Sequence, residues 1–264
     1  MTELRHLQLV ILDIIKDIDS LCTKNNIEYY LLGGSAIGAI RHQGFIPWDD
    51  DLDIIMTADN YNKFIEVCKK ELNTNKYILQ EGEKDWALPF SKIRLKGTKL
   101  IEIEGPAEDN NMQGIFVDIF KLDYAYSSKI LQYWQYFCGK VYLSHALSLR
   151  SYKSASIKKK LLMLLSSPLK IRFIRNFFKA QAEPLNDKNS QYLCFLYGRT
   201  KFRNTFTPKV IYGKPLRVPF ENLMLPVPEH YDAYLTQMFG NYMQLPPVEQ
   251  RQGLHCVSID FGEY

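Results

Sequence analysis

The order of apolar and polar residues predicts helices alternating with short strands over the first half of the chain. Apolar positions recur at helical spacing over residues 4–25, which predicts an amphipathic helix. Ile27–Leu32 is apolar and aromatic and ends at two glycines, which predicts a strand that enters a turn. We expect a short helix over Ser35–Arg41, a loop over Gly44–Asp50 and a strand over Leu52–Met56 to follow.

The rest of the sequence predicts further helices and strands. A helix over Asp59–Leu72 is expected, with Asp59 as its cap. Strands are expected in four further apolar runs: Tyr77–Gln80, Phe90–Leu95, Thr98–Glu104 and Ile115–Phe120. Residues 127–182 carry long helical patterns, and the proline-rich chain after Asn204 predicts a strand at Glu221–Leu225 and a helix at Glu229–Phe239.

These elements predict a mixed α/β (α+β) fold in three parts. We expect a catalytic core over residues 1–126, in which a mixed sheet is flanked by helices. A helical, basic amphipathic subdomain is expected over 127–205, and a return segment that packs on the core over 206–264. At 264 residues and 46% hydrophobic content, the chain is long enough to bury a sizeable core.

Charge and cysteine usage exclude several classes of protein. A formal net charge of +4 is too small to indicate a nucleic-acid partner. The five cysteines are scattered, and none forms a C-x-x-C pair, so we expect free thiols and not zinc knuckles or disulfides. No signal-peptide pattern is visible, and no uncharged apolar run reaches about 18 residues. We therefore expect a cytoplasmic protein.

Four carboxylates crowd into the five residues from Asp49 to Asp53. Two unit charges 4 Å apart repel by about 1 kcal/mol in water and by several times that near a protein surface. A divalent cation relieves this repulsion, and oxygen ligands favour Mg²⁺ or Mn²⁺. Side chains alternate along a strand, so Asp51 and Asp53 are expected on one face, about 7 Å apart. Asp49 and Asp50 lie in the preceding loop and are weaker candidates. The alternative interpretation is a solvated acidic turn.

Two other features point to phosphate chemistry. Gly33-Gly34-Ser35 follows a predicted strand and opens a helix, where backbone N–H groups and a hydroxyl can cradle a phosphate, although a tight turn uses the same residues. Asp118 is a lone acid in the apolar run from Ile115 to Phe120, and is either a second metal ligand, a general base or a solvated edge residue. Asp123 is expected to be a turn residue at the end of the strand.

At this point the sequence resembles a known family. Leu32–Met56, which reads LGGSAIGAIRHQGFIPWDDDLDIIM, resembles the signature of the LicD family, whose relatives include fukutin and fukutin-related protein. The resemblance continues through Ser91–Arg94 and Thr98, through Gly114–Asp123, and in the tail from Tyr234 to Pro247. It therefore spans both ends of the chain, whereas residues 127–205 carry little of it.

The resemblance implies a fold and a reaction. The fold is a nucleotidyltransferase core of the DNA polymerase β type. The reaction is transfer of a substituted phosphate from a CDP-activated donor, with CDP-choline as the first candidate, to a hydroxyl of a glycan or lipid-linked glycan, with release of CMP. In bacterial members the acceptor is a teichoic acid, capsule or lipopolysaccharide precursor.

The resemblance also implies roles by position. Asp51, Asp53 and Asp118 match the metal-binding and catalytic carboxylates. The residues expected to bind the donor phosphates are Gly33, Gly34, Ser35, Arg41, Lys92 and Arg94. Arg41 is included because it lies between the glycine turn and the acidic strand. For Lys92 and Arg94 the alternative is an exposed strand cation.

The sequence departs from the family pattern at two places. Lys121 replaces the usual proline after the Asp118 strand, which is expected to alter the local turn. The clustered zinc cysteines of fukutin-related protein are absent, which favours a bacterial-type member. If choline is the donor headgroup, a cage of aromatic rings near an acid is expected.

Several alternatives stay open at this point. A true nucleotidyltransferase, which moves NMP from NTP to a small molecule, would use the same carboxylates. An inactive scaffold in glycan assembly is the other candidate. The segment 153–179 combines basic and apolar residues, which is typical of a peripheral contact with the inner face of the plasma membrane or of a helical subdomain with an ordinary solvated basic face.

Overall fold

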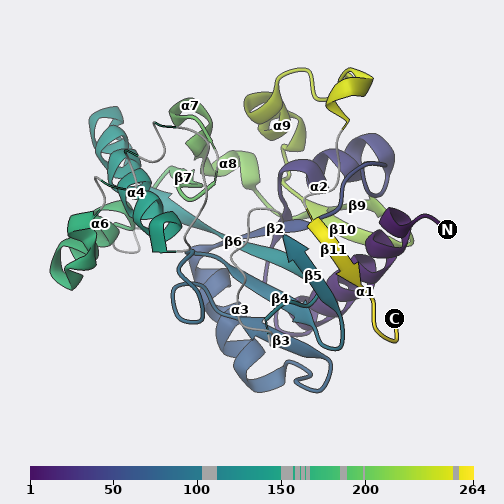
Figure 1. Cartoon of the computed structure of the whole chain (residues 1–264). Coiled ribbons are helices and arrows are strands. Elements are labelled where there is room, and N and C mark those ends of the chain that lie inside the picture. Colours follow the sequence, from purple (N-terminus) through teal and green to yellow (C-terminus); the bar gives the residue numbers. More distant parts are fainter. Residues whose placement is uncertain are drawn as a thin grey trace.

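In the computed structural model of the chain, the described residues are 1–102, 112–149, 157, 161, 164, 167–184, 189–198, 200–251 and 256–264. A mixed sheet forms the centre of this part of the chain (Figure 1). Its main strands are hydrogen-bonded in the order β1-β2-β6-β4-β3. Their bounds are β1 (Tyr30–Leu31), β2 (Asp53–Thr57), β6 (Phe116–Ala125), β4 (Ser91–Leu95) and β3 (Tyr77–Gln80). β2 and β6 are parallel, and the other neighbours on this path are antiparallel.

Two amphipathic helices pack against the sheet. α1 (Glu3–Lys24) confirms the predicted first helix and buries its apolar stripe in the main core. α3 (Ala58–Glu71) follows β2 directly and contacts both β2 and β6. The predicted cap of α3 was wrong, because the helix begins at Ala58. The Asp59 side chain instead accepts a hydrogen bond from the Tyr124 hydroxyl at 3.1 Å.

The chain between β1 and β2 forms a helical turn and then a loop. α2 (Gly33–Ile37) continues into a π-helical turn, η1 (Gly38–His42), so the predicted short helix is confirmed and begins earlier. The loop that follows is held from the side by α1. Gln8 is buried there, and its amide nitrogen donates to the carbonyl oxygens of Ile46 at 3.3 Å and Asp49 at 2.9 Å.

Two antiparallel ribbons lie outside the central sheet. β5 (Lys99–Glu102) pairs with β11 (Cys256–Asp260), which brings the C-terminal strand beside a segment from the middle of the chain (Figure 1). β9 (Leu216–Phe220) and β10 (Leu223–Val227) form a hairpin. The strand predicted near Glu221–Leu225 is confirmed as β10, but it begins at Leu223, because Glu221 has a φ of 55° and lies in the turn of this hairpin.

A helical layer covers the end of β6. α4 (Lys129–Leu149) and α6 (Arg172–Ala182) confirm helices in the predicted helical segment, and a 3₁₀ turn, η2 (Ser167–Lys170), precedes α6. A second buried cluster, which includes Cys138, Tyr142 and Leu196, lies beneath them. β7 (Tyr192–Cys194) pairs with β6, and β8 (Phe206–Pro208) pairs with β7, so this segment also extends the sheet. The predicted three-part division stays a prediction.

The remaining elements are short. They are α7 (Phe202–Thr205), α8 (Lys209–Tyr212), α9 (Tyr231–Phe239) and η3 (Val248–Gln250). All five cysteines lie in the described residues and are free thiols, as the sequence predicted. Among the described residues, no helix combines the length and the apolar character that are needed to cross a bilayer.

Candidate active site

Acidic side chains from two parallel strands meet at one end of the sheet. Asp53 opens β2 and lies directly beside Asp118 of β6 in the strand register. Residues paired in this way point to the same face of a sheet. The predicted proximity of these two acids is therefore confirmed. Asp51 lies just before β2 and not within it, so strand alternation does not place its side chain.

The two paired acids have shifted proton affinities. Burial raises the pKa of Asp53 well above its ordinary value, and repulsion from Asp51, Asp118 and Asp49 raises it further. Burial also raises the pKa of Asp118, while the nearby Lys92 ammonium opposes that shift. Carboxylates whose mutual repulsion raises their pKa form a site that favours a bound cation.

Asp49 belongs to this cluster, although the sequence made it a weak candidate. Its carboxylate packs against Gly34, where an added Cβ would lie 2.9 Å from Asp49 Oδ2. Gly34 therefore allows the acidic loop to approach the glycine turn. Gln8 of α1 holds the loop that carries Asp49 by donating to its backbone carbonyl. Gln8 lies 41 positions earlier in the chain, so no local sequence pattern identifies this contact.

The donor set fits a hard cation only in part. Carboxylate oxygens suit Mg²⁺ or Mn²⁺, and Mg²⁺ is commonly bound through one or two carboxylates together with substrate phosphates. In the part of the chain that the structure describes, no three His, Cys, Asp or Glu side chains are arranged to hold one ion. The predicted set of Asp51, Asp53 and Asp118 is therefore not a complete protein cage. A metal held jointly with donor phosphates stays a prediction.

The glycine turn is tied to the acidic strand through the backbone. The Asp53 N–H donates to Ser35 Oγ at 2.9 Å, and the Ser35 hydroxyl can still donate its own proton. Gly33 opens α2 with a φ of 56°, which glycine adopts at no steric cost. Its N–H donates to the hydroxyl of Tyr234 at 3.4 Å. Tyr234 comes from α9 and was missed as a site residue, although it lies in the tail that resembles the family.

Lys92 lies inside the site and not on its surface. Its Nζ is 2.9 Å from Asp118 Oδ1 and 3.5 Å from Glu102 Oε1, and the residue is only 1% exposed. The ammonium also lies 3.3 Å from the centroid of the Phe116 ring, with the rings of Trp86 and Phe90 further away. The alternative of an exposed strand cation was wrong. This aromatic and acidic enclosure is filled by the protein's own cation, so the residues of a choline cage stay unassigned.

Arg94 is also buried, and its guanidinium binds protein groups. Nε donates to Gln80 at 2.8 Å, and Nη1 donates to the Gly114 carbonyl at 2.9 Å. Glu102 lies 3.9 Å away. These contacts give Arg94 a structural role in joining β3, β4 and the start of β6. A direct contact with a donor phosphate, which the family resemblance implied, would have to replace them.

Arg41 links the π-helical turn to the C-terminal tail. Its Nη1 donates to the carbonyl of Tyr242 at 2.6 Å, and its Nε donates to His42. Partial burial and the charge of Arg251 lower the pKa of Arg41. Arg251 in turn lies 5.2 Å from the ring centroid of Trp48, beside the acidic loop. Arg41 and Arg251 are thus close enough for their charges to interact, and Arg251 packs on the residue that precedes Asp49.

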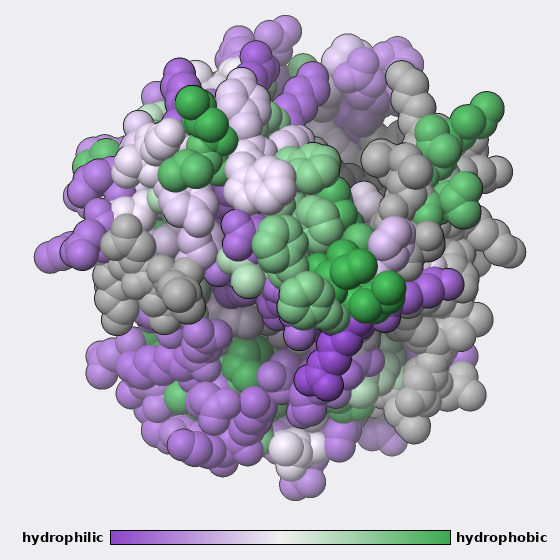
Figure 2. Space-filling model, turned by 90° about the vertical axis from the view of Figure 1, so that its left-hand side faces the viewer, coloured by the Kyte–Doolittle hydropathy of each residue, from purple (hydrophilic) through white to green (hydrophobic). Residues whose placement is uncertain are grey.

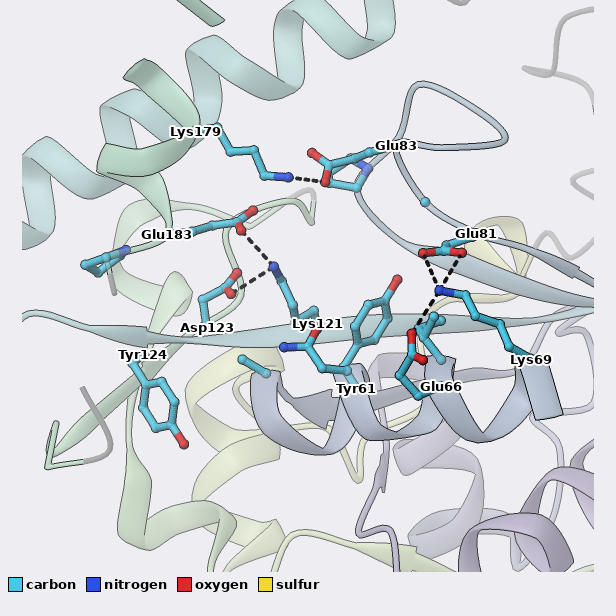
Figure 3. Close-up of a pocket in the computed structure, with 16 residues that line it drawn as sticks. Tyr61, Glu66, Lys69, Glu81, Glu83, Lys121, Asp123, Tyr124, Lys179 and Glu183 are labelled. Carbon is cyan, nitrogen blue, oxygen red and sulfur yellow. Dashed lines mark hydrogen bonds and ion pairs between the residues drawn. The ribbon is translucent and has the colours of Figure 1, made fainter. Parts of the chain in front are cut away.

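A separate pocket of about 510 Å³ lies at the other end of β6, between α3, α6 and the β3–β4 connection (Figure 3). Lys121 points between Asp123 and Glu183, at 3.1 and 2.9 Å. Lys121 and Asp123 follow Asp118 by three and five residues. Because side chains alternate along a strand, both project from the face opposite Asp118. The predicted turn at Asp123 was wrong, because Asp123–Ala125 pair with β7 and the strand continues to Ala125.

Together, the fold and the site define a mixed α/β protein with a carboxylate cluster beside a glycine turn. Residues 26–158 match the family described as "LicD/FKTN/FKRP, nucleotidyltransferase domain". The chain belongs to the LicD family.

Individual relatives support this assignment. The chain is 31% identical to a protein of Haemophilus influenzae named lipopolysaccharide cholinephosphotransferase LicD, over 96% of each chain. It is 54% identical over 76 residues to an uncharacterized protein of Rickettsia prowazekii, a match that covers 22% of this chain and 29% of that protein.

Proposed function

We propose that this chain is a LicD-type phosphotransferase that moves phosphocholine from a CDP-activated donor to a hydroxyl of a lipopolysaccharide-type glycan. The full-length similarity to a lipopolysaccharide cholinephosphotransferase carries this proposal. The carboxylate pair Asp53 and Asp118, beside a glycine turn, supports it independently because phosphoryl transfer needs such a site. We also propose that the sheet is a nucleotidyltransferase-type core, in line with the family description.

In the proposed reaction, the acceptor hydroxyl oxygen attacks the β-phosphorus of the donor. The bond from that phosphorus to the bridging oxygen breaks, and CMP leaves with that oxygen. Asp118 accepts the hydroxyl proton, and Lys92 beside it stabilises the carboxylate until then. Asp51 and Asp53 would hold a Mg²⁺ or Mn²⁺ ion, which when bound neutralises charge on the donor diphosphate.

The residues of the turn and the tail are proposed to position the donor. The backbone N–H groups of Gly33 and Gly34 and the Ser35 hydroxyl would donate to phosphate oxygens, with the phosphate replacing the Tyr234 hydroxyl as the acceptor of the Gly33 N–H. Arg41 and Arg251, of which Arg251 packs on the Trp48 ring next to the acidic loop, would add positive charge for the donor diphosphate.

A donor panel with Mg²⁺ tests this function. CDP-choline, CDP-glycerol, CDP-ribitol, CTP and ATP are each incubated with the protein and a choline-free lipopolysaccharide acceptor, and CMP and pyrophosphate release are measured. CMP release from CDP-choline alone is the expected result. Pyrophosphate from a nucleoside triphosphate would replace the proposal with the nucleotidyltransferase alternative. If no donor yields product or shifts the melting temperature, the inactive scaffold becomes the better description.

A further inference from the structure

The outer side of α4 is apolar, although its inner side already packs on the protein. On its inner side, Gln135, Cys138 and Tyr142 of α4 are buried. Ile130 at 81% exposure and the half-exposed Trp134 and Phe137 follow at spacings of four and three residues and form an exposed apolar stripe along the helix. Exposed large apolar side chains gathered on one face mark a binding surface.

α6 has three distinct sides. Phe178 packs beside the second buried cluster, together with the buried Ala182, which defines the inner side. Phe173, which is 81% exposed, and Phe177 point outward at a spacing of four residues. At 100° per residue, Arg172 and Lys179 project about 120–140° around the helix from this aromatic pair, whereas Arg175 projects from the side away from it.

Ring contacts join the two helices into one surface. The rings of Trp134 and Phe137 are 5.8 Å apart, those of Phe137 and Phe178 are 6.3 Å apart, and those of Phe178 and Phe177 are 5.6 Å apart. Figure 2, which faces this side of the molecule, shows apolar side chains gathered near its middle with hydrophilic ones around them. We call this the α4–α6 surface: Ile130, Trp134, Phe137, Phe173 and Phe177, with the exposed Arg172 at its flank.

The charge of this part of the chain has one sign. Between Tyr124 and Ala182 the sequence contains eleven of the 33 Lys and Arg residues and none of the 29 Asp and Glu residues. α4 and α6 themselves carry no acid. A ligand for this surface must therefore supply both apolar volume and negative charge.

An anionic bilayer supplies both. Phe and Ile side chains can enter the boundary between headgroups and acyl chains, Trp prefers the headgroup level, and Arg attracts anionic lipids. A second copy of the chain would place two surfaces of the same charge against each other, which repel. We propose that the α4–α6 surface binds an anionic lipid bilayer peripherally.

This inference shifts the contact that the sequence predicted. The predicted segment was 153–179, of which residues 153–156, 158–160, 162, 163, 165 and 166 lie outside the described residues. The structure adds the outer side of α4, which the sequence pattern did not mark as a membrane contact. The described surface is formed by α4 and α6 together.

Vesicle sedimentation of the full chain tests the proposal. The vesicles are phosphatidylcholine alone, or phosphatidylcholine mixed with phosphatidylglycerol. The wild-type chain is expected to sediment with the mixed vesicles at low salt, less with phosphatidylcholine alone and less at high salt. The double variant Ile130→Ser/Phe173→Ser is expected to reduce binding at least tenfold. Because both side chains are exposed, the fold should persist, and circular dichroism checks this.

The matched control is Val210→Ser/Val248→Ser. Both valines are 69% exposed but lie outside α4 and α6, so this variant is expected to bind like the wild type. Equal loss in both double variants, or no binding of the wild type to mixed vesicles, overturns the proposal. So does concentration-dependent dimerisation that Ile130→Ser/Phe173→Ser abolishes, because the surface would then bind a second copy. Since binding and not turnover is measured, the result is independent of the proposed function.

Discussion

Lys92 Nζ lies 2.9 Å from Asp118 Oδ1, across a register pair of the antiparallel strands β4 and β6. Because Lys92 is buried, Asp118 has a fixed counter-ion within the protein. The neighbouring acid Asp53 also lies beside Asp118, on the parallel strand β2. Asp118 is therefore placed between a cation on one side and an acid on the other, so the charge of each neighbour controls the proton affinity of the proposed base.

Removal of Lys92 should destabilise the fold. Lys92→Met leaves the Asp118 carboxylate buried without its ammonium partner, and breaking a buried ion pair typically costs about 3–5 kcal/mol. The double variant Lys92→Met/Asp118→Asn removes both charges and is expected to recover most of that loss. Urea unfolding of the two variants measures this coupling. Turnover should stay absent in the double variant, since the proposed base is gone. Equal instability of both variants would show that Lys92 acts through packing and not through Asp118.

Asp53→Asn should remove activity without weakening the fold. The pKa of Asp53 is raised in the folded protein, so its ionised form costs stability that increases as the pH rises above its ordinary value. The amide removes that cost, so the melting temperature at pH 8 should equal or exceed that of the wild type. Turnover is expected to fall by about 10²–10³-fold or more.

Mg²⁺ titration separates this effect from a general loss of charge. Mg²⁺ with CDP-choline is expected to raise the melting temperature of the wild type and of Asp13→Asn, an exposed acid on α1, but not that of Asp53→Asn. A normal Mg²⁺ response in Asp53→Asn would remove Asp53 from the proposed metal site.

Gly33→Ala should affect both stability and donor binding. Its φ of 56° is unfavourable for alanine by about 1–2 kcal/mol, although no atom lies within 4 Å of the added Cβ. Gly97→Ala is the matched control, because Gly97 has a φ of 78° and its nearest neighbour would be 4.0 Å away, but it lies in the turn between β4 and β5. Both variants should lose similar stability in urea unfolding. Only Gly33→Ala should raise the KM for the donor, and equal KM values would contradict a role of this turn in phosphate binding.

Local pattern was sufficient where an element is defined by its own residues. The spacing of Leu7, Ile11, Ile14 and Ile18 predicted α1, and the strand at Tyr77–Gln80 was predicted with the bounds that β3 has. The proximity of Asp53 and Asp118 was also predictable, because an acid inside an otherwise apolar strand is typical of a functional site. These features depend on short stretches of chain.

Long-range partners explain what the sequence could not predict. β6 was predicted to end at Phe120 because Lys121 and Asp123 interrupt the apolar run, yet β7, which lies far along the chain, pairs with Asp123–Ala125, and Glu183 pairs with Lys121. Lys92 reads as an exposed cation until Phe116, Asp118 and Glu102 are known to surround it. The roles of Gly33, Ser35 and Asp51 in binding stay predictions, since no ligand geometry defines them.

The Lys121–Asp123–Glu183 cluster should make stability depend on pH. Burial raises the pKa of Asp123 to about 7, above its ordinary value of 3.8, although Lys121 opposes the shift. Between these two values the folded chain binds more protons than the unfolded chain, so the free energy of unfolding contributed by Asp123 decreases as the pH rises through this window. The contribution is fully lost above about pH 7.

Asp123→Asn isolates this contribution, because the amide cannot ionise. The stability of the variant relative to the wild type should be greater at about pH 8 than at about pH 5. The gain is about 1.4 kcal/mol for each unit by which the folded-state pKa of Asp123 exceeds the lower pH. Urea unfolding at the two pH values measures the gain, and Asp13→Asn should follow the wild type. Asp53 and Asp118 also have raised pKa values, but they are present in all three proteins and cancel in the comparison. If Asp123→Asn and the wild type keep the same difference in stability at both pH values, Asp123 is ionised throughout, and Lys121 and not burial determines its charge.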